Sequence, residues 1–187
     1  MCSDQNKNSL MAEKPIKKQL VDGSPPMTSD QILALLEKSG VTHSTKDHPP
    51  MWTVEDAKAL RSPCDYGHTK NLFVRNKKGS MWLLTLHEDR HVDLKETARL
   101  VGTNRFSFAS EQRLMHYLGV VPGAVSPLSI LNDVGRRVVF FIDKVLLDAP
   151  ALHIHPLINT RTTTVQTDEL ISFMAVQGHQ SHVLSFD

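Results

Sequence analysis

Apolar residues recur at helical spacing in some segments of the chain and in short continuous runs in others. Ile32, Leu35 and Leu36 form a helical stripe after a Thr28 that is followed three residues later by Gln31. This spacing is a capping box, and it predicts a helix over residues 28–40. Two apolar runs around the turn NKKG, within residues 71–87, predict a β-hairpin. The same patterns predict further helices over 53–61, 93–102, 111–119 and 167–178, and strands over 41–48, 105–110, 136–147, 152–166 and 182–186.

Helices and strands are therefore interleaved without strict alternation. This order predicts the α/β (α+β-like) class, as a single compact domain with a mixed sheet flanked by helices. Residues 1–27 are polar, mixed in charge and end in DGSPPM, which is typical of a flexible N-terminal extension. The domain is expected to span residues 28–187. A loop rich in Gly, Pro and Ser, over residues 120–133, is too long to be a simple turn.

The overall charge argues against nucleic-acid binding through a global field. The 187 residues carry a formal net charge of +1, so an RNA contact needs a local basic patch, and no DNA partner is expected. The candidates for such a patch, which are also ordinary solubilising charges, are Arg75, Lys77, Lys78, Arg136 and Arg137. Two cysteines, no membrane-length apolar run and no secretory h-region predict a cytoplasmic protein without a membrane partner.

One motif matches a zinc-peptidase pattern. HEDRH, residues 87–91, satisfies H-E-x-x-H, in which one helix face presents both histidines to a metal. Here a strand-like run precedes the motif, and Asp93 after it is expected to cap the next helix. The two histidines then straddle a strand-to-helix turn, so a zinc hydrolase is the lesser alternative, and no metal is expected.

Two other arrangements of histidine and cysteine have competing interpretations. His153 and His155 in HIHP lie on one face of a predicted strand, either as two metal ligands or as one histidine that faces a pocket. Cys64 is a nucleophile with His68 as its base, or it is an inert cysteine. Neither arrangement decides the function.

Two segments are better candidates for a binding pocket. GAVSPLS, from Gly123, combines small side chains with Pro127, so a ligand can reach backbone groups; a crossover loop that merely turns has the same composition. Lys70 and Asn71 open an apolar strand, and more cations follow on the same hairpin. A cation at a strand mouth suits an anionic ligand, although most lysines are simply solvated.

These segments together resemble the YbaK/prolyl-tRNA-synthetase-associated domain family. The similarity rests on TKNLFV, the hairpin and helix after it, RFSFASEQRLMHYLGVVPGAVSPLSILND, HPLINTRTTTV and HVLSFD, and it covers residues 28–187. Within the family, the chain is most similar to the free-standing editing enzymes that deacylate Ala-tRNA(Pro). The resemblance implies a compact mixed sheet with a small cleft and a hydrolase of the ester at the terminal adenosine of tRNA. It implies no cofactor.

The resemblance also implies the site. The family's lysine and asparagine fall on Lys70 and Asn71, and its histidine before proline-leucine falls on His155; these three are the candidate catalytic residues. The candidate substrate-binding residues are Gly123, Val125, Ser126, Pro127, Asn159 and Met51. All are matched through family motifs except Met51, which with Trp52 is either an apolar pocket wall or core.

The expected partner is the acceptor end of aminoacyl-tRNA(Pro), with prolyl-tRNA synthetase as a transient partner. Alanine is the expected amino acid, with cysteine and serine as alternatives. The alternative function from another class is a non-catalytic module that binds tRNA or synthetase.

Overall fold

The computed structural model describes residues 18–50 and 67–186. The helix predicted over 53–61 lies outside these ranges, as do Met51, Trp52 and Cys64. The α-helices are α1 (Ser29–Lys38), α3 (Leu94–Leu100), α4 (Glu111–Arg113) and α5 (Thr167–Val176), and the shorter turns are η1 (Leu114–Leu118, a π-helix), η2 (Pro127–Asn132) and η3 (Lys144–Asp148). The strands are β1 (His43–Asp47), β2 (Gly67–Arg75), β3 (Met81–His87), β4 (Ser107–Phe108), β5 (Val138–Asp143), β6 (Ala151–Ile154), β7 (Arg161–Gln166) and β8 (Ser181–Leu184).

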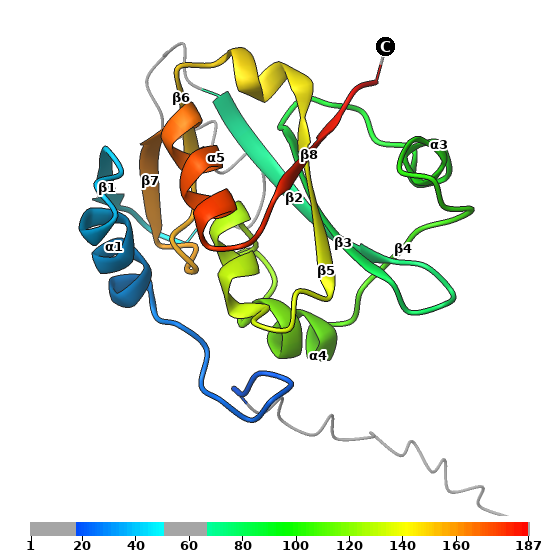
Figure 1. Ribbon diagram of the computed structural model, residues 1–187, viewed down its shortest axis with the longest axis horizontal. Coiled ribbons are helices and arrows are strands. Elements are labelled where there is room, and N and C mark those ends of the chain that lie inside the picture. Colours follow the sequence, from blue (N-terminus) through cyan, green and yellow to red (C-terminus); the bar gives the residue numbers. More distant parts are fainter. Residues whose placement is uncertain (1–17, 51–66, 187) are drawn as a thin grey trace, which may run out of the picture.

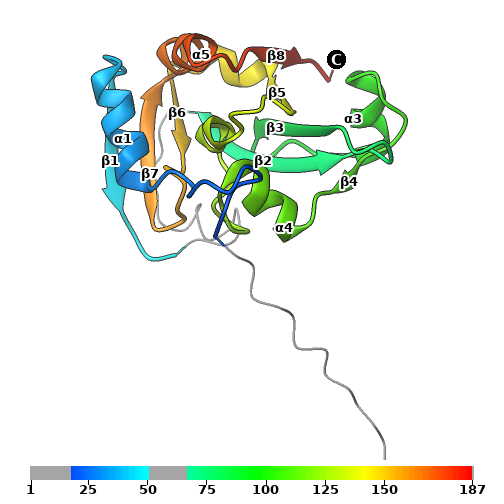
Figure 2. The same cartoon turned by 60° about the horizontal axis from the view of Figure 1, so that its bottom comes forward.

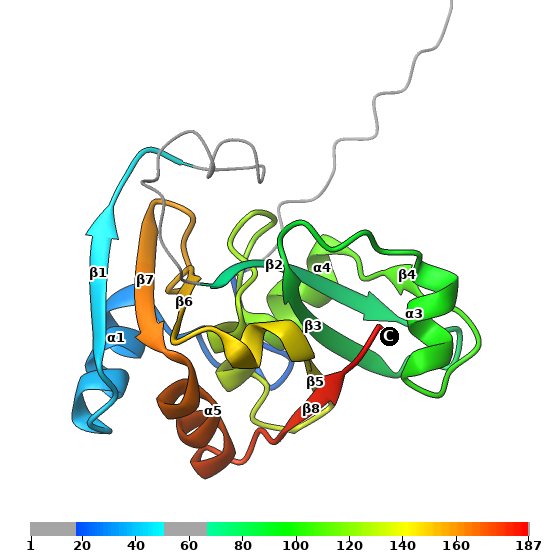
Figure 3. The same ribbon diagram turned by 90° about the horizontal axis from the view of Figure 1, so that it is seen from above.

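The described strands form one mixed sheet of eight strands, in the order β1-β7-β6-β2-β3-β5-β8, with β4 also beside β2. The pairs β2–β6, β3–β5 and β5–β8 are parallel, and the other pairs are antiparallel. The helices pack around this sheet (Figure 1), so the predicted fold class is confirmed. β2 belongs to both halves of the sheet, and Figure 3 shows it passing from the half of β6 and β7 to the half of β3 and β5.

The two faces of β2 and β3 are covered by different hydrophobic clusters. The larger cluster includes Ile32 and Leu36 of α1, Phe73 of β2 and Leu128 of η2. The smaller cluster lies on the other face and includes Val74 of β2, Trp82 of β3 and Ala98 of α3. Because strand side chains alternate between faces, neighbouring residues of β2 belong to different clusters.

Most of the predicted elements are present. The Thr28–Gln31 capping box forms in both directions, and the hairpin pairs β2 with β3 antiparallel around the predicted turn. Asp93 caps α3, and Ser110 caps α4.

Four elements differ from the prediction. The predicted loop 120–133 contains the 3-10 helix η2, and the strand predicted over 136–147 ends at Asp143 and continues as η3. The extended segment 152–166 is two antiparallel strands with a turn between them. The helix predicted over 167–178, where Thr167 suggests a side-chain cap, begins after Gln166 without one, and the Thr167 hydroxyl instead donates to the Ala149 carbonyl 2.6 Å away.

The segment before Thr28 also packs on the domain. Leu20 is buried, the Val21 amide donates to the His116 carbonyl, and the Met27 amide donates to Asn132 Oδ1 at 2.9 Å. In Figure 2 this segment runs along the side of the domain before α1 begins. Residues 20–27, the last part of the predicted extension, therefore contact the folded unit.

Candidate active site

Lys70 and Asn71 project from opposite faces of β2. The Lys70 Nζ donates a hydrogen bond to the carbonyl of Arg90, on the face of the smaller cluster. Asn71 Oδ1 accepts a bond of 2.7 Å from the hydroxyl of Thr85, its register partner on β3, which is fully buried. The Thr85 contact fixes the Asn71 amide, and within residues 18–50 and 67–186 no hydrogen bond uses its nitrogen, which can therefore donate to a ligand.

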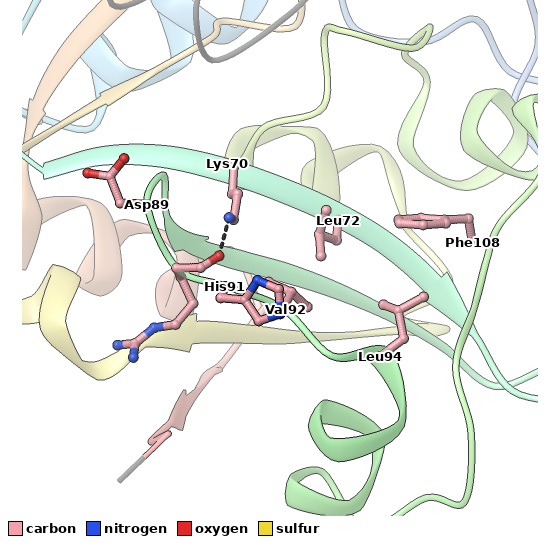
Figure 4. Close-up of a pocket in the computed structure, with 8 residues that line it drawn as sticks. Lys70, Leu72, Asp89, His91, Val92, Leu94 and Phe108 are labelled. Atoms are coloured by element: carbon pink, nitrogen blue, oxygen red, sulfur yellow. Dashed lines mark hydrogen bonds between the residues drawn. The ribbon is translucent and has the colours of Figure 1, made fainter.

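A pocket of about 550 Å³ surrounds the Lys70 side chain. Figure 4 shows the lysine at one end, next to the carbonyl of Arg90, and Phe108 at the other end, with Leu72 between them. Burial lowers the pKa of Lys70 below its usual value, while the carboxylates of Asp89 and Glu88 oppose this shift. The pocket thus holds a partly desolvated amine beside an apolar wall.

The Lys70 pocket is shaped by the turn that contains HEDRH. Arg90 of this turn makes a bidentate pair with Asp143, at 2.9 Å for both Nε and Nη2. The Asp143 carboxylate is fully buried, and it also accepts from the amides of His87 and Val145. The Arg90 guanidinium lies 4.6 Å from the centre of the Phe186 ring. These contacts fix the carbonyl that binds Lys70.

The edge of β2 that faces away from β3 is only partly paired. β6 pairs with Gly67 and His68, and β4 pairs with Val74 and Arg75. No strand in the described part of the chain pairs with residues 69–73 on this edge. A ligand at this edge is within reach of both faces, so it can meet Lys70 from one side and Asn71 from the other.

The backbone of Asn71 is directed at the same edge. The Phe73 carbonyl accepts from the Ala109 amide on this side, whereas the His68 carbonyl accepts from Glu88 on the β3 side. Backbone groups alternate along a strand, so those of Asn71 point the same way as those of Phe73. The edge therefore offers an amide and a carbonyl in addition to the two side chains.

His155 lies just beyond the end of β6, close to this edge. Its neighbour on the same strand face, His153, is the register partner of His68, and their rings stack with centroids 4.8 Å apart. Lys70 lies two residues beyond His68 and His155 two residues beyond His153, so the His68–His153 pair aligns the two candidate residues along the chain, although the pairing itself ends there. Sequence spacing alone could not give this alignment, which depends on pairing between β2 and β6.

The tautomer of His155 is set by the start of β7. Its Nδ1 lies 2.8 Å from the Arg161 carbonyl, which can only accept, so Nδ1 carries the proton and Nε2 presents a lone pair. Burial lowers the pKa of His155, with a smaller contribution from His48. Arg161 is itself tied to Asp47 and Asp30 at 2.8 and 2.5 Å. The imidazole is thus a neutral acceptor at neutral pH.

The predicted loop 123–127 lies on the Asn71 face of the sheet. Gly123 adopts φ 83, and Ala124 and Val125 pack in the larger cluster together with Leu157 of the β6–β7 turn. Pro127 begins η2 directly after Ser126, which is fully buried. Among the described residues, the Ser126 Oγ has no hydrogen-bond partner, although a buried hydroxyl normally has one.

Four of the predicted site residues thus lie in the pocket beside β2, at its unpaired edge or in the turn next to that edge. Lys70 lines the pocket, Asn71 and His155 lie at or near the unpaired edge, and Asn159 lies half-buried in the β6–β7 turn. Met51 is outside the described residues.

His48, which sequence reasoning missed, has its ring centre 6.0 Å from that of His155, and its Nε2 lies 2.9 Å from the Thr162 hydroxyl. A lone histidine before two prolines carries no signal that distinguishes it.

HEDRH does not have the geometry of a zinc helix. His87 ends β3, where its Nδ1 accepts from the Asp89 amide at 3.3 Å, while His91 lies in the turn before α3. In the ranges 18–50 and 67–186, no three His, Cys, Asp or Glu side chains gather closely enough to hold a metal ion. The described helices also include none long and apolar enough to cross a membrane.

A His87→Ala variant is therefore expected to keep its deacylation rate within about twofold, since only its imidazole contact to Asp89 is lost. The rate should also be unchanged by EDTA. Initial rates of aminoacyl-tRNA deacylation, with and without chelator, measure both. A hundredfold loss in the variant together with stoichiometric zinc by metal analysis would contradict this assignment.

Comparison with known proteins gives the class of the chain. Residues 48–173 match the model of the aminoacyl-tRNA editing domain. The chain belongs to this family, and it is an aminoacyl-tRNA deacylase. The match covers β2, β6 and the loop 123–127, and thus the whole described site.

The chain is similar to particular proteins whose names refer to prolyl-tRNA. The prolyl-tRNA editing protein ProX of Acetoanaerobium sticklandii is 32% identical over 79% of this chain and 91% of its own length. The prolyl-tRNA synthetase associated domain-containing protein 1 of Danio rerio is 31% identical over 84% of this chain and 86% of its own length. A solved structure described provisionally as a trans-editing enzyme for prolyl tRNA synthetase has a TM-score of 0.63 and 20% identity, over 86% of this chain and 98% of that one. The last similarity concerns the fold.

Proposed function

We propose that this protein edits prolyl-tRNA in trans, and that its main substrate is Ala-tRNA(Pro). The observation that carries the proposal is the family match together with Lys70 in a pocket beside an unpaired strand edge. One relative named for prolyl-tRNA editing and one named for a prolyl-tRNA synthetase associated domain support the tRNA, and the sequence resemblance described above supports alanine. The partner is then the acceptor end of aminoacyl-tRNA(Pro), with prolyl-tRNA synthetase as a transient partner. Such a substrate places the enzyme with the translation machinery in the cytoplasm.

The reaction is hydrolysis of an activated ester. Water attacks the carbonyl carbon, the bond to the ribose oxygen breaks, and that oxygen leaves with a proton. Because the ester is already activated, positioning of the nucleophile and stabilisation of the oxyanion suffice. The vicinal ribose hydroxyl is a second way to position or activate the water.

The side chains divide this work in our proposal. The Lys70 ammonium polarises the ester or holds the terminal nucleotide, and the Asn71 amide orients the substrate from the other face. His155 uses its Nε2 lone pair to accept a proton or a hydrogen bond, because its Nδ1 is bound to Arg161. Gly123, Val125, Ser126 and Pro127 supply backbone groups to the amino acid and ribose, and Asn159 binds nearby.

Selectivity follows from size in this proposal. A pocket that admits alanine and rejects proline does so by steric exclusion, which discriminates well against larger side chains. Met51 remains our candidate for an apolar wall of that pocket.

The test is deacylation of Ala-tRNA(Pro) by the purified protein in the presence of EDTA. The proposal predicts turnover with chelator present. A non-catalytic module that binds tRNA would instead show salt-sensitive binding without turnover.

The acid limb of the pH–rate profile is expected to lie below pH 6.5. A lowered pKa means that His155 gains its proton only below its usual value of 6.5, so it stays neutral and competent above that pH. Single-turnover rates from pH 5 to 8, corrected for uncatalysed hydrolysis, measure the limb. His182→Gln, a change of a histidine on β8, should leave the profile intact. A rate that already falls at pH 7 in the wild-type protein would contradict the assignment.

A further inference from the structure

Phe108 is unusual among the exposed residues of this chain. It is 60% exposed, and it is the only aromatic residue among the large hydrophobic side chains that are exposed in the described ranges. It lies on the two-residue strand β4, which pairs with the end of β2. Its ring forms one end of the pocket whose other end is Lys70 (Figure 4).

The strand register places Phe108 and Lys70 on the same face. Lys70, Leu72 and Val74 alternate onto one face of β2, and Phe108 is the antiparallel partner of Val74. Directly opposed residues of an antiparallel pair share a face. The four residue steps from Lys70 to Val74 span about 13 Å at the rise of a strand. That length is comparable to one nucleoside with an aminoacyl group.

The floor between these ends is apolar. Leu72 lies between them, and Val92 and Leu94 of the following turn and helix complete the wall. The Asp89 carboxylate lies near Lys70, so the lysine end disfavours a second negative group and suits a neutral ester or ribose. A planar base at the aromatic end and a ribose over the aliphatic floor match this distribution.

A second hollow with cationic walls adjoins the pocket at the segment 91–94. This hollow, of about 560 Å³, shares His91, Val92 and Leu94 with the first and is lined further by Lys95 and Arg105. The carboxylate of Asp93, which also lines it, is committed to the amides of Lys95 and Glu96 at the start of α3. Two cations therefore line this neighbouring hollow, as expected for a surface that binds the backbone of a nucleic-acid strand.

We infer that Phe108 is the stacking platform for the terminal adenine of the tRNA, with the single-stranded 3′ end leaving the pocket past Lys95 and Arg105. This inference rests on the proposed function, since it takes the occupant to be an aminoacyl-tRNA end. Stacking of a base on an aromatic side chain is worth about a fivefold to 150-fold change in affinity. Phe108 is then a substrate-binding residue that acts on affinity more than on the chemical step.

The test is a double-mutant cycle between Phe108 and the terminal adenosine. Two acceptor-stem RNAs are compared, one complete and one that lacks only the last adenosine, and their dissociation constants are measured by fluorescence anisotropy. Wild-type protein is expected to prefer the complete RNA about tenfold, and Phe108→Leu to bind both RNAs equally. Phe108→Trp should restore the preference, and Val176→Ala, a change of an exposed residue on α5, should keep it.

A preference for the complete RNA in Phe108→Leu that equals the wild-type preference would overturn the inference, as would wild-type protein that does not distinguish the two RNAs. Failure of the proposed reaction has a different signature. Wild-type protein that prefers the complete RNA but does not deacylate Ala-tRNA(Pro) would count against the reaction and leave the base contact in place.

Discussion

Lys70→Ala is expected to lower the rate of Ala-tRNA(Pro) deacylation at least about a hundredfold, the usual cost of removing a group that stabilises charge in the transition state. The side chain is the cation at the inner end of the pocket, and its amine is held by the Arg90 carbonyl. Single-turnover rates at saturating enzyme measure the chemical step. Lys38→Ala, at the exposed end of α1, is the matched control and should be unchanged.

Lys70→Arg separates two roles for the charge. A lysine that only holds the RNA end is replaced by arginine with a modest rise in KM, because the cation is kept. A lysine that polarises the ester requires the compact ammonium, and kcat then falls while KM changes little. Full activity of Lys70→Ala would remove this residue from the mechanism.

Asp143→Ala is expected to destabilise the fold by about 3–5 kcal/mol, the usual cost of removing one partner of a buried ion pair. Its fully buried carboxylate accepts two bonds from Arg90 and one each from the amides of His87 and Val145. Its loss leaves an arginine that is only one quarter exposed without its counter-ion. Urea unfolding followed by circular dichroism measures the change.

The control for this variant is Asp148→Ala, at the exposed end of η3, which should change the free energy of unfolding by less than about 0.5 kcal/mol. Activity provides a second readout. Because Asp143 fixes the turn whose carbonyl binds Lys70, folded Asp143→Asn should deacylate more slowly than the wild type. Equal stability of Asp143→Ala and Asp148→Ala would show that the pair does not hold this turn.

The elements of the fold that depend on local chemistry could be predicted from the sequence. The capping box at Thr28 and Gln31, the hairpin turn after Arg75 and the cap at Asp93 each form as predicted. The end of β5 could not be predicted, because the apolar run continues past Asp143 into η3. That carboxylate is directed inward by Arg90, a residue distant in sequence.

In the candidate site, too, the features set by local sequence could be predicted, whereas those set by long-range strand pairing could not. Lys70 and Asn71 are predicted as site residues because they are polar residues that open an apolar strand. They project from opposite faces of β2, and a ligand can reach both of them only because this edge of β2 is unpaired. That edge exists because β6 stops beside His68 and β4 begins beside Val74, and such long-range pairing leaves no local signal. HEDRH illustrates the reverse case, in which a local pattern suggested zinc and its arginine turns out to hold the turn through Asp143.

The central claim is that this chain clears alanine from tRNA(Pro) by admitting small side chains. The most direct test is a deacylation panel of tRNA(Pro) charged with Ala, Ser, Cys or Pro, at equal enzyme and with uncatalysed hydrolysis subtracted. The account predicts that Ala-tRNA(Pro) is cleared fastest and that Pro-tRNA(Pro) remains intact, with any cleavage of the Ser and Cys esters falling between them. Hydrolysis of Pro-tRNA(Pro) at the rate of Ala-tRNA(Pro), or no turnover of any member, would contradict it.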